Sequence, residues 1–223
     1  MRLKQDMSRA MQDCSEDFEL FTLEDLNTAI THLKHGKASG EDGITAEMIT
    51  HFGERAKAWL LSMLNNCVSS FKTPKIWRRA RVVALLKPGK DPTSPKSYRP
   101  IFLLCIPYKL YERMILARIH GTVEENLTED QPGFRPGCSC CSQVLNLTQY
   151  IEDGFETKHI TGTIFVDLTG AYDTVNHRTL LLKVAQMVRN STLVRIIESL
   201  LADRRFYVEM DGEKSRWRIK KNG

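Results

Sequence analysis

The sequence predicts an α+β fold, and the order of helix-like and strand-like segments supports this prediction. Residues 21–70 show apolar residues at helical spacing, and the first apolar run typical of a strand begins only after residue 80. From there, strand-like and helix-like segments alternate to the end of the chain. Helices first, then strands mixed with helices, is an element order typical of α+β proteins. The 223 residues are 42% apolar and 26% charged, which suffices for a sizeable core.

The first seventy residues are predicted to be helical after an irregular start. Residues 1–20 contain many charges, few apolar positions and no periodicity, so we expect a linker or a disordered N-terminus there. Thr22 begins a sequence similar to a capping box, and the apolar stripe after it predicts a helix to about Leu33. Two further helices are predicted, one from Thr45 and one over 54–70.

The middle of the chain combines one strand with two helices. The compact apolar run at 81–86 predicts a strand that is turned by the Pro-Gly pair after it. Pro107 can open a helix, because proline is favoured in the first helical turn. Another helix is predicted to begin at Ser139. We expect its apolar positions to be buried, namely Val144, Leu147 and Ile151.

The C-terminal part begins with a short apolar run, 164–166, which predicts a buried strand that ends in Asp167. A carboxylate at the end of a buried strand is unfavourable unless a partner neutralises it. Mg²⁺ would do so, since it prefers one or two carboxylates together with phosphate oxygens. The alternative is an aspartate that caps a turn. Asn176 then caps a predicted helix, a further helix follows at 192–201, and 205–219 predicts a hairpin turned by an Asp-Gly pair.

Four segments of the sequence resemble motifs of reverse transcriptases of the non-LTR (LINE-like, jockey/CR1-like) retrotransposons. The pattern Asp167-x-x-x-x-Tyr-Asp is similar to motif A of that family, and Lys87-Pro-Gly-Lys-Asp followed by Ser97-Tyr-Arg-Pro-Ile is similar to its fingers motif. Gln131-Pro-Gly-Phe-Arg-Pro-Gly resembles the next block, and the Gly-rich segment 36–44 resembles the N-terminal block. The segments follow the family's order and extend from about residue 21 to the end of the chain.

The resemblance implies a right-hand polymerase that is truncated before the second catalytic block of its palm. The lack of periodicity leaves 1–20 as a linker or disordered N-terminus. The resemblance implies a fingers-like region with a helical N-terminal part over 21–160, and a partial palm with motif A and a C-terminal hairpin over 161–223. The family's aromatic-Ala-Asp-Asp block is absent from the 223 residues. We therefore expect an RNA-directed DNA polymerase whose C-terminal palm and thumb are missing, and which is inactive as this chain.

The resemblance also implies site residues for two-metal nucleotidyl transfer. Asp167 matches the catalytic, metal-binding aspartate, and the backbone carbonyl of Leu168 matches a second ligand for Mg²⁺ or Mn²⁺. Asp173 matches a structural position. Tyr172, with Ala171 beside it, matches the gate next to the nucleotide sugar, where a bulky ring leaves no room for a 2′-hydroxyl; taken alone, Tyr172 would be read as a core aromatic residue.

Two cations match the fingers residues that hold the incoming triphosphate, Lys87 as a point charge and Arg99 as a bidentate fork. The alternative for both is a solvated loop position. Residues 71–120 contain 12 basic and 2 acidic side chains, whereas the whole chain has a net charge of +5. Such a local excess suits a polyanion, so we expect an RNA template, a DNA primer and dNTP as partners. The expected template and primer contacts are Arg78, Arg79 and Arg135.

Two other functions compete with this interpretation. A non-catalytic basic RNA-binding remnant would show the same residual motifs, and an in-frame continuation to an Ala-Asp-Asp turn would distinguish it from a polymerase. A metal phosphatase of the haloacid-dehalogenase-like class requires a second aspartate two residues after the first, where Thr169 stands.

The cysteines and the apolar runs of the sequence indicate the cellular compartment in which the protein is expected. Among the six cysteines only Cys138 and Cys141 have C-x-x-C spacing, and the Cys138-Ser-Cys-Cys cluster has no second ligand pair nearby that could complete a zinc site, which favours thiols in a reducing compartment. The sequence contains no apolar run long enough to cross a membrane and no secretory signal at its start. We therefore expect an intracellular protein, cytoplasmic and nuclear, that is not secreted and has no membrane partner.

Overall fold

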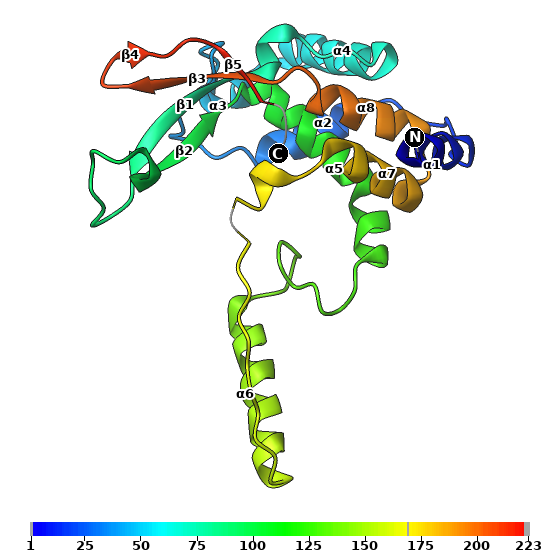
Figure 1. Ribbon diagram of the computed structural model, residues 1–223. Coiled ribbons are helices and arrows are strands. Elements are labelled where there is room, and N and C mark those ends of the chain that lie inside the picture. Colours follow the sequence, from blue (N-terminus) through cyan, green and yellow to red (C-terminus); the bar gives the residue numbers. More distant parts are fainter. Residues whose placement is uncertain (1, 169, 221–223) are drawn as a thin grey trace.

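The computed structural model describes residues 2–168 and 170–220, and it confirms the α+β class. Figure 1 shows a body with helices on one side and a twisted sheet on the other, and a single helix, α6, that extends away from this body. The helices that form the body are α1 (Arg2–Gln12), α2 (Leu23–Thr31), α3 (Ala46–Thr50), α4 (Glu54–Ser70), α5 (Ile106–Asn126), α7 (His177–Val188) and α8 (Ser191–Leu201).

One hydrophobic core holds the N-terminal helices against α5 and α8. Leu26, Ile49, Leu64, Tyr111 and Ile196 come from five different helices and are fully buried in it. The predicted capping box at the start of α2 is present: the Thr22 side chain accepts from the backbone N–H of Asp25, and the carboxylate of Asp25 accepts from the backbone N–H of Thr22. The local signals for α2, α4 and α5 are therefore confirmed.

The N-terminus corrects one prediction. Residues 2–12 form helix α1, where a linker or disordered segment was expected over 1–20. Met7, Ala10 and Met11 pack against a small core of Leu181 and Ala185 on α7. These positions have helical spacing, and the pattern was overlooked because alanine and methionine among many charges give a weak apolar signal.

The sheet has five strands in the order β2-β1-β3-β4, with β5 paired to β3. Its strands are β1 (Arg79–Leu86), β2 (Tyr98–Leu103), β3 (Arg205–Met210), β4 (Glu213–Lys214) and β5 (Arg218–Ile219). Strands β1 and β2 form an antiparallel pair, whereas β1 and β3 run parallel with Arg79 opposite Arg205. The predicted C-terminal hairpin is present: Asp211 and Gly212 connect β3 to β4, and both have the positive φ that a two-residue hairpin turn requires.

The segment from 138 to 168 corrects two further predictions. Helix α6 (Cys140–Glu156) starts where expected, but none of its side chains is buried, and Val144 is 63% exposed. The chain then returns along α6 in an extended form, as Figure 1 shows. The run 164–166 is no strand there, and Ile164 is 88% exposed. A strand is stabilised by a neighbouring backbone, and in the described part of the chain no strand pairs with this run.

The difference in burial between the core and α6 can be tested with one pair of variants. We expect Leu64→Ala to lower the free energy of unfolding by about 2–5 kcal/mol, because it leaves a cavity at a fully buried position. Leu145→Ala on α6 removes the same atoms at a position that is 67% exposed, and we expect a change within about 0.5 kcal/mol. Urea denaturation of both variants measures the difference, and a similar loss in both would show that α6 is packed in solution.

Candidate active site

The β1–β2 hairpin places the two predicted triphosphate-binding cations on one face. The backbone N–H of Lys87 donates to the carbonyl oxygen of Ser97 at 2.8 Å, which continues the β1–β2 register by one step. Arg99 follows Ser97 by two residues, so its side chain lies on the same face as that of Lys87. Diagonal neighbours of this kind are about 7–8 Å apart in an antiparallel pair. One phosphate chain can therefore span both cations.

The loop between the two strands is held by its own hydrogen bonds. Asp91 accepts from the backbone N–H of Thr93 at 2.9 Å and from its hydroxyl, and these bonds hold the pKa of Asp91 below its usual value. The hydroxyl of Tyr98 donates to the carbonyl of Pro92 at 3.0 Å, and the Lys87 ammonium donates to the carbonyl of Lys96 at 3.0 Å. A polar loop of this kind keeps its shape at the edge of the sheet without a hydrophobic core.

The segment around Asp167 is open to solvent. A turn at Gly170, with φ +62°, separates Asp167 from the short 3-10 helix η3 (Tyr172–Thr174). The side chain of Asn176 accepts from the backbone N–H of Thr179 and caps α7, as predicted. The predicted site residues of this segment are all exposed: Asp167, Leu168, Ala171 and Tyr172.

The described residues do not complete a metal site. No group of three or more His, Cys, Asp or Glu side chains within 2–168 and 170–220 could hold a metal ion, and this holds for the exposed Cys138 cluster as well. Asp167 offers one carboxylate and Leu168 a backbone carbonyl. Mg²⁺ requires near-octahedral oxygen coordination, so these two groups are at most part of a site.

The loop 131–137 reaches the predicted gate. The ring of Phe134 lies edge-on to that of Tyr172, with the centroids 6.1 Å apart. Phe134 is 95% exposed, and its place in the segment 131–137 that resembles a family motif is its only signal in the sequence. Its neighbour Arg135 is turned inward: the guanidinium contacts the Glu124 carboxylate at 2.5 Å and the carbonyl of Thr128 at 2.9 Å. Arg135 therefore anchors the loop to the end of α5.

The two other predicted template contacts also pair with acids. Arg78 lies 3.2 Å from the Asp203 carboxylate. Arg79 lies 3.9 Å from Glu41, and its guanidinium is 5.3 Å from the centre of the Trp217 ring. A nucleic-acid phosphate would have to compete with these partners, although the side chain of Arg79 remains 45% exposed.

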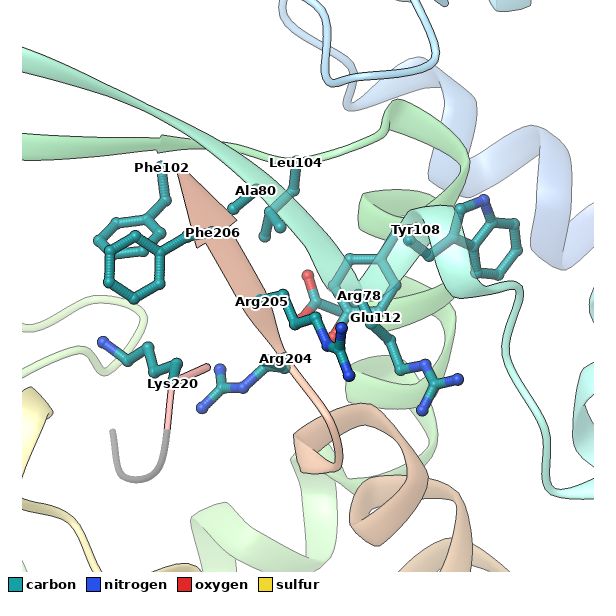
Figure 2. Close-up of a pocket in the computed structure, with 11 residues that line it drawn as sticks. Arg78, Ala80, Phe102, Leu104, Tyr108, Glu112, Arg204, Arg205, Phe206 and Lys220 are labelled. Carbon is teal, nitrogen blue, oxygen red and sulfur yellow. The ribbon is translucent and has the colours of Figure 1, made fainter. Parts of the chain in front are cut away.

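A contact that the sequence did not predict joins the Asp167 segment to the sheet. The Lys220 ammonium lies 2.7 Å from the carboxylate of Asp173 and 4.9 Å from the centre of the Phe102 ring. Phe102 in turn packs edge-to-face with Phe206 on β3. Figure 2 shows the ammonium end of Lys220 below these two rings. The basic run near the C-terminus was the only sequence signal for Lys220.

A cavity of about 220 Å³ lies beside this contact, between the sheet and α5 (Figure 2). Aromatic and cationic side chains line it, together with one acid, Glu112. Burial raises the pKa of Glu112, against the opposing effects of the Tyr108 hydroxyl and the Arg204 charge. The Arg204 guanidinium also lies 3.3 Å from the Nε2 atom of His177 at the start of α7. These pairings tie α5, α7 and the sheet together.

The structure does not bring all predicted site residues into one place. In Figure 1 the loop from 87 to 97 lies at the outer end of the sheet, whereas the segment from 159 to 168 lies next to α6 and below the helical body. Lys87 and Arg99 thus form one group, and Asp167 and Tyr172 form another. Phe102, which contacts Lys220, lies three positions after Arg99 on β2, so the alternation of side chains along a strand places the two on opposite faces of the sheet.

None of the helices in the described ranges is long and apolar enough to cross a membrane.

Comparison with known proteins agrees with the motif order. The family described as "Reverse transcriptase (RNA-dependent DNA polymerase)" matches residues 85–223. The chain is 34% identical over 203 residues to the Drosophila melanogaster protein named "Probable RNA-directed DNA polymerase from transposon BS", an alignment that covers 90% of this chain and 22% of that protein. It is 33% identical over 196 residues to the "RNA-directed DNA polymerase from mobile element jockey" of Drosophila funebris, with 87% of this chain and 21% of the relative covered.

A third relative, the "Probable RNA-directed DNA polymerase from transposon X-element" of Drosophila melanogaster, is 31% identical over 80% of this chain and 20% of its own length. The chain thus spans about a fifth of the length of these curated relatives. The family match covers more than half of the chain and includes both groups of site residues. The chain belongs to the reverse transcriptase family, in the form carried by non-LTR retrotransposons.

Proposed function

We propose that this chain supplies the nucleotide-binding face and the first catalytic aspartate of an RNA-directed DNA polymerase. The main support is the pairing of Lys87 and Arg99 on one face of the β1–β2 hairpin, within the region that matches the family. Two cations of different geometry at this spacing suit a triphosphate, because lysine acts as a point charge and arginine as a planar fork.

Nucleotide addition is a phosphoryl transfer, in which the protein positions the reactants and compensates charge. Lys87 and Arg99 bind the phosphate chain and orient it. Asp167 and the carbonyl of Leu168 are the groups that this chain contributes to a divalent metal site, where Mg²⁺ or Mn²⁺ would neutralise charge on the triphosphate. That the 223 residues alone lack polymerase activity stays a prediction.

Tyr172 selects the sugar of the incoming nucleotide. Tyr172 is 68% exposed, which supports a contact with a nucleotide over a position in the core. An exposed ring beside Ala171 can lie against a deoxyribose and exclude a 2′-hydroxyl by its bulk. The contact with Phe134 restricts where that ring can move.

The template and primer bind along the basic part of the chain. Arg78, Arg79 and Arg135 contact backbone phosphates, and Arg79 is the most accessible of them because its side chain is 45% exposed. Phosphate contacts position a nucleic acid and carry no sequence information.

The alternative function is a non-catalytic RNA-binding protein. Such a protein would carry the same motifs. The two functions differ in whether the carboxylate of Asp167 matters, which leads to the first prediction below.

Asp167→Asn in the full-length protein that contains this chain should reduce DNA synthesis to background, since the amide keeps the shape of the side chain and removes its charge. Asp13→Asn, at an exposed position near the end of α1, is the matched control and should leave synthesis unchanged. Primer extension on an RNA template measures both. Near-normal extension by Asp167→Asn, with RNA binding retained, would favour the non-catalytic alternative.

Tyr172→Ala in the same protein should admit ribonucleotides more readily, because the bulk that excludes the 2′-hydroxyl is gone. Tyr172→Phe keeps the ring and should keep the discrimination. The measurement is the ratio of kcat/KM for dNTP to that for rNTP. If this ratio is the same in the alanine variant and in the unmodified protein, Tyr172 does not contact the sugar.

Binding of the chain to RNA and DNA should weaken steeply as salt rises, because counterion release dominates contacts between cations and phosphates. Arg79→Gln should weaken binding about equally for unrelated sequences and reduce the slope of log K against log salt by about one. Arg55→Gln, an exposed arginine on α4 outside the basic block, is the control. Fluorescence anisotropy at several salt concentrations tests this, and a flat salt dependence would contradict it.

A further inference from the structure

One face of the sheet carries a group of cations. Side chains alternate between the two faces along a strand, and the pairing of the strands places several basic residues on the face of Arg99, namely Arg79, Arg81 and Lys214. Glu209 is an acid on the same face and lies 3.9 Å from Arg81. One residue further along β1 and β3, the opposite face carries Ala80, Val82 and Phe206 and meets α5 across the cavity. Positive charge is therefore concentrated on the face that α5 does not cover.

An aromatic pair lies among these cations. The Tyr207 ring is buried, and the ring of Trp217 lies 4.8 Å from it, centre to centre, at an interplanar angle of 76°. The Arg79 guanidinium is 5.3 Å from the centre of the Trp217 ring, and the Lys214 ammonium is 5.6 Å from the centre of the Tyr207 ring. Trp217 nevertheless remains 42% exposed. Its ring is held by its neighbours while part of it stays open to solvent.

The same face continues from this pair toward the tip of the β1–β2 hairpin. Its side chains along β1 and β2 include exposed apolar ones, and Val83, Leu85 and Ile101 are 38%, 53% and 42% exposed. Strand β1 has eight residues and is therefore about 26 Å long. The face is thus an extended surface of mixed apolar and cationic side chains. It has Trp217 near one end and the pair of Lys87 and Arg99 near the other.

This combination of side chains suits an unpaired nucleic-acid strand. Proteins that bind single strands combine cations for the backbone with aromatic rings on which bases stack, and every base has a flat face that can stack. The bases of a duplex already stack on one another and are not free to do so. An acidic peptide would satisfy the cations, but it does not supply a flat ring at each step for Trp217.

We propose that Trp217 stacks on one base of an unpaired nucleic-acid strand that lies across this face of the sheet, with a neighbouring phosphate bound to Arg79. The inference rests on the proposed function and deepens it, because the strand is the single-stranded part of the template. The guanidinium of Arg79 can take part because its side chain is 45% exposed. Tyr207 is a positioning residue that supports the Trp217 ring from below and does not touch the strand.

The test measures how the full-length protein that contains this chain binds a labelled single-stranded RNA, by fluorescence anisotropy. Trp217→Leu removes the aromatic ring and keeps an apolar side chain. We expect its Kd to rise at least about fivefold, which corresponds to the loss of one stacked base. The slope of log K against log salt should not change, because no cation is removed. Trp217→Phe keeps a ring and should keep most of the affinity.

Trp59→Leu is the matched control. Trp59 lies on α4, away from the sheet, and is 69% exposed. Its replacement should leave the Kd unchanged. An abasic strand of the same length keeps the phosphates and lacks the bases, so Trp217→Leu and the unmodified protein should bind it equally. A blunt RNA–DNA duplex offers no unpaired base, and we expect no difference between the two proteins there either.

The outcomes separate this inference from the proposed function. If Trp217→Leu binds the single strand as tightly as Trp59→Leu does, while Asp167→Asn abolishes synthesis, the stacking role is wrong and the proposed function stands. If Trp217→Leu weakens binding of the duplex and of the abasic strand as much as that of the RNA, the ring only supports the sheet, and the inference also fails. If the stacking effects are all seen but Asp167→Asn is active, the polymerase function fails and single-strand binding remains.

Discussion

The parallel pairing of β1 with β3 is the constraint on which the rest of the structure depends. It joins residues 79–83 to 205–209, so the chain between them must leave the sheet, cross the helical body and return. A parallel pair cannot be closed by a tight turn, and here the connection contains α5, α6, α7 and α8. The paired strands are buried at Ala80, Val82 and Tyr207. Both groups of site residues are placed by this closure.

The hairpin group, Lys87 and Arg99, depends directly on the pairing of β1 with β3. Strand β1 is central, with β2 on one side and β3 on the other, so the tip with Lys87 projects from a strand supported on both edges. The other group, Asp167 and Tyr172, depends on the pairing of β1 with β3 indirectly, because β3 leads through its hairpin to Lys220. The ion pair between Asp173 and Lys220, which are 47 positions apart, then joins η3 to the segment that follows the sheet strands.

The extended segment next to α6 lies outside the part of the chain that the pairing of β1 with β3 holds in place. Ile164, Phe165 and Val166 are more than 80% exposed, although their sequence is typical of a buried strand. Local propensity cannot form a strand without a neighbouring backbone, because the hydrogen bonds of a ladder come from another segment. Contiguous exposed apolar side chains of this kind are typical of a surface that contacts something else.

Sequence signals that involve only a few neighbouring residues predicted the local structure correctly. The capping box at Thr22, the proline that opens α5 and the Asp211-Gly212 turn each specify their own geometry. The placement of Lys87 and Arg99 on one face was also accessible, because a hairpin register follows from its turn. The errors concern contacts between distant segments: the packing of α1 on α7, the exposed run at 164–166 and the pairing of Asp173 with Lys220.

The basic residues show the same difference between local sequence signals and contacts between distant segments. The excess of basic residues in 71–120 suggested a broad basic surface, but the fold uses several of these arginines internally. The pairs are Arg78 with Asp203, Arg79 with Glu41, Arg81 with Glu209, and Arg118 with Asp25. Within the described residues, Lys87, Lys90, Lys96 and Arg99 have no ion pair with an acid. These four surround the tip of the β1–β2 hairpin, whereas the other basic residues of 71–120 without such a pair, Lys72, Lys75, Lys109 and Arg113, lie elsewhere. About half of the positive charge that remains for a polyanion therefore lies where the proposed triphosphate site is.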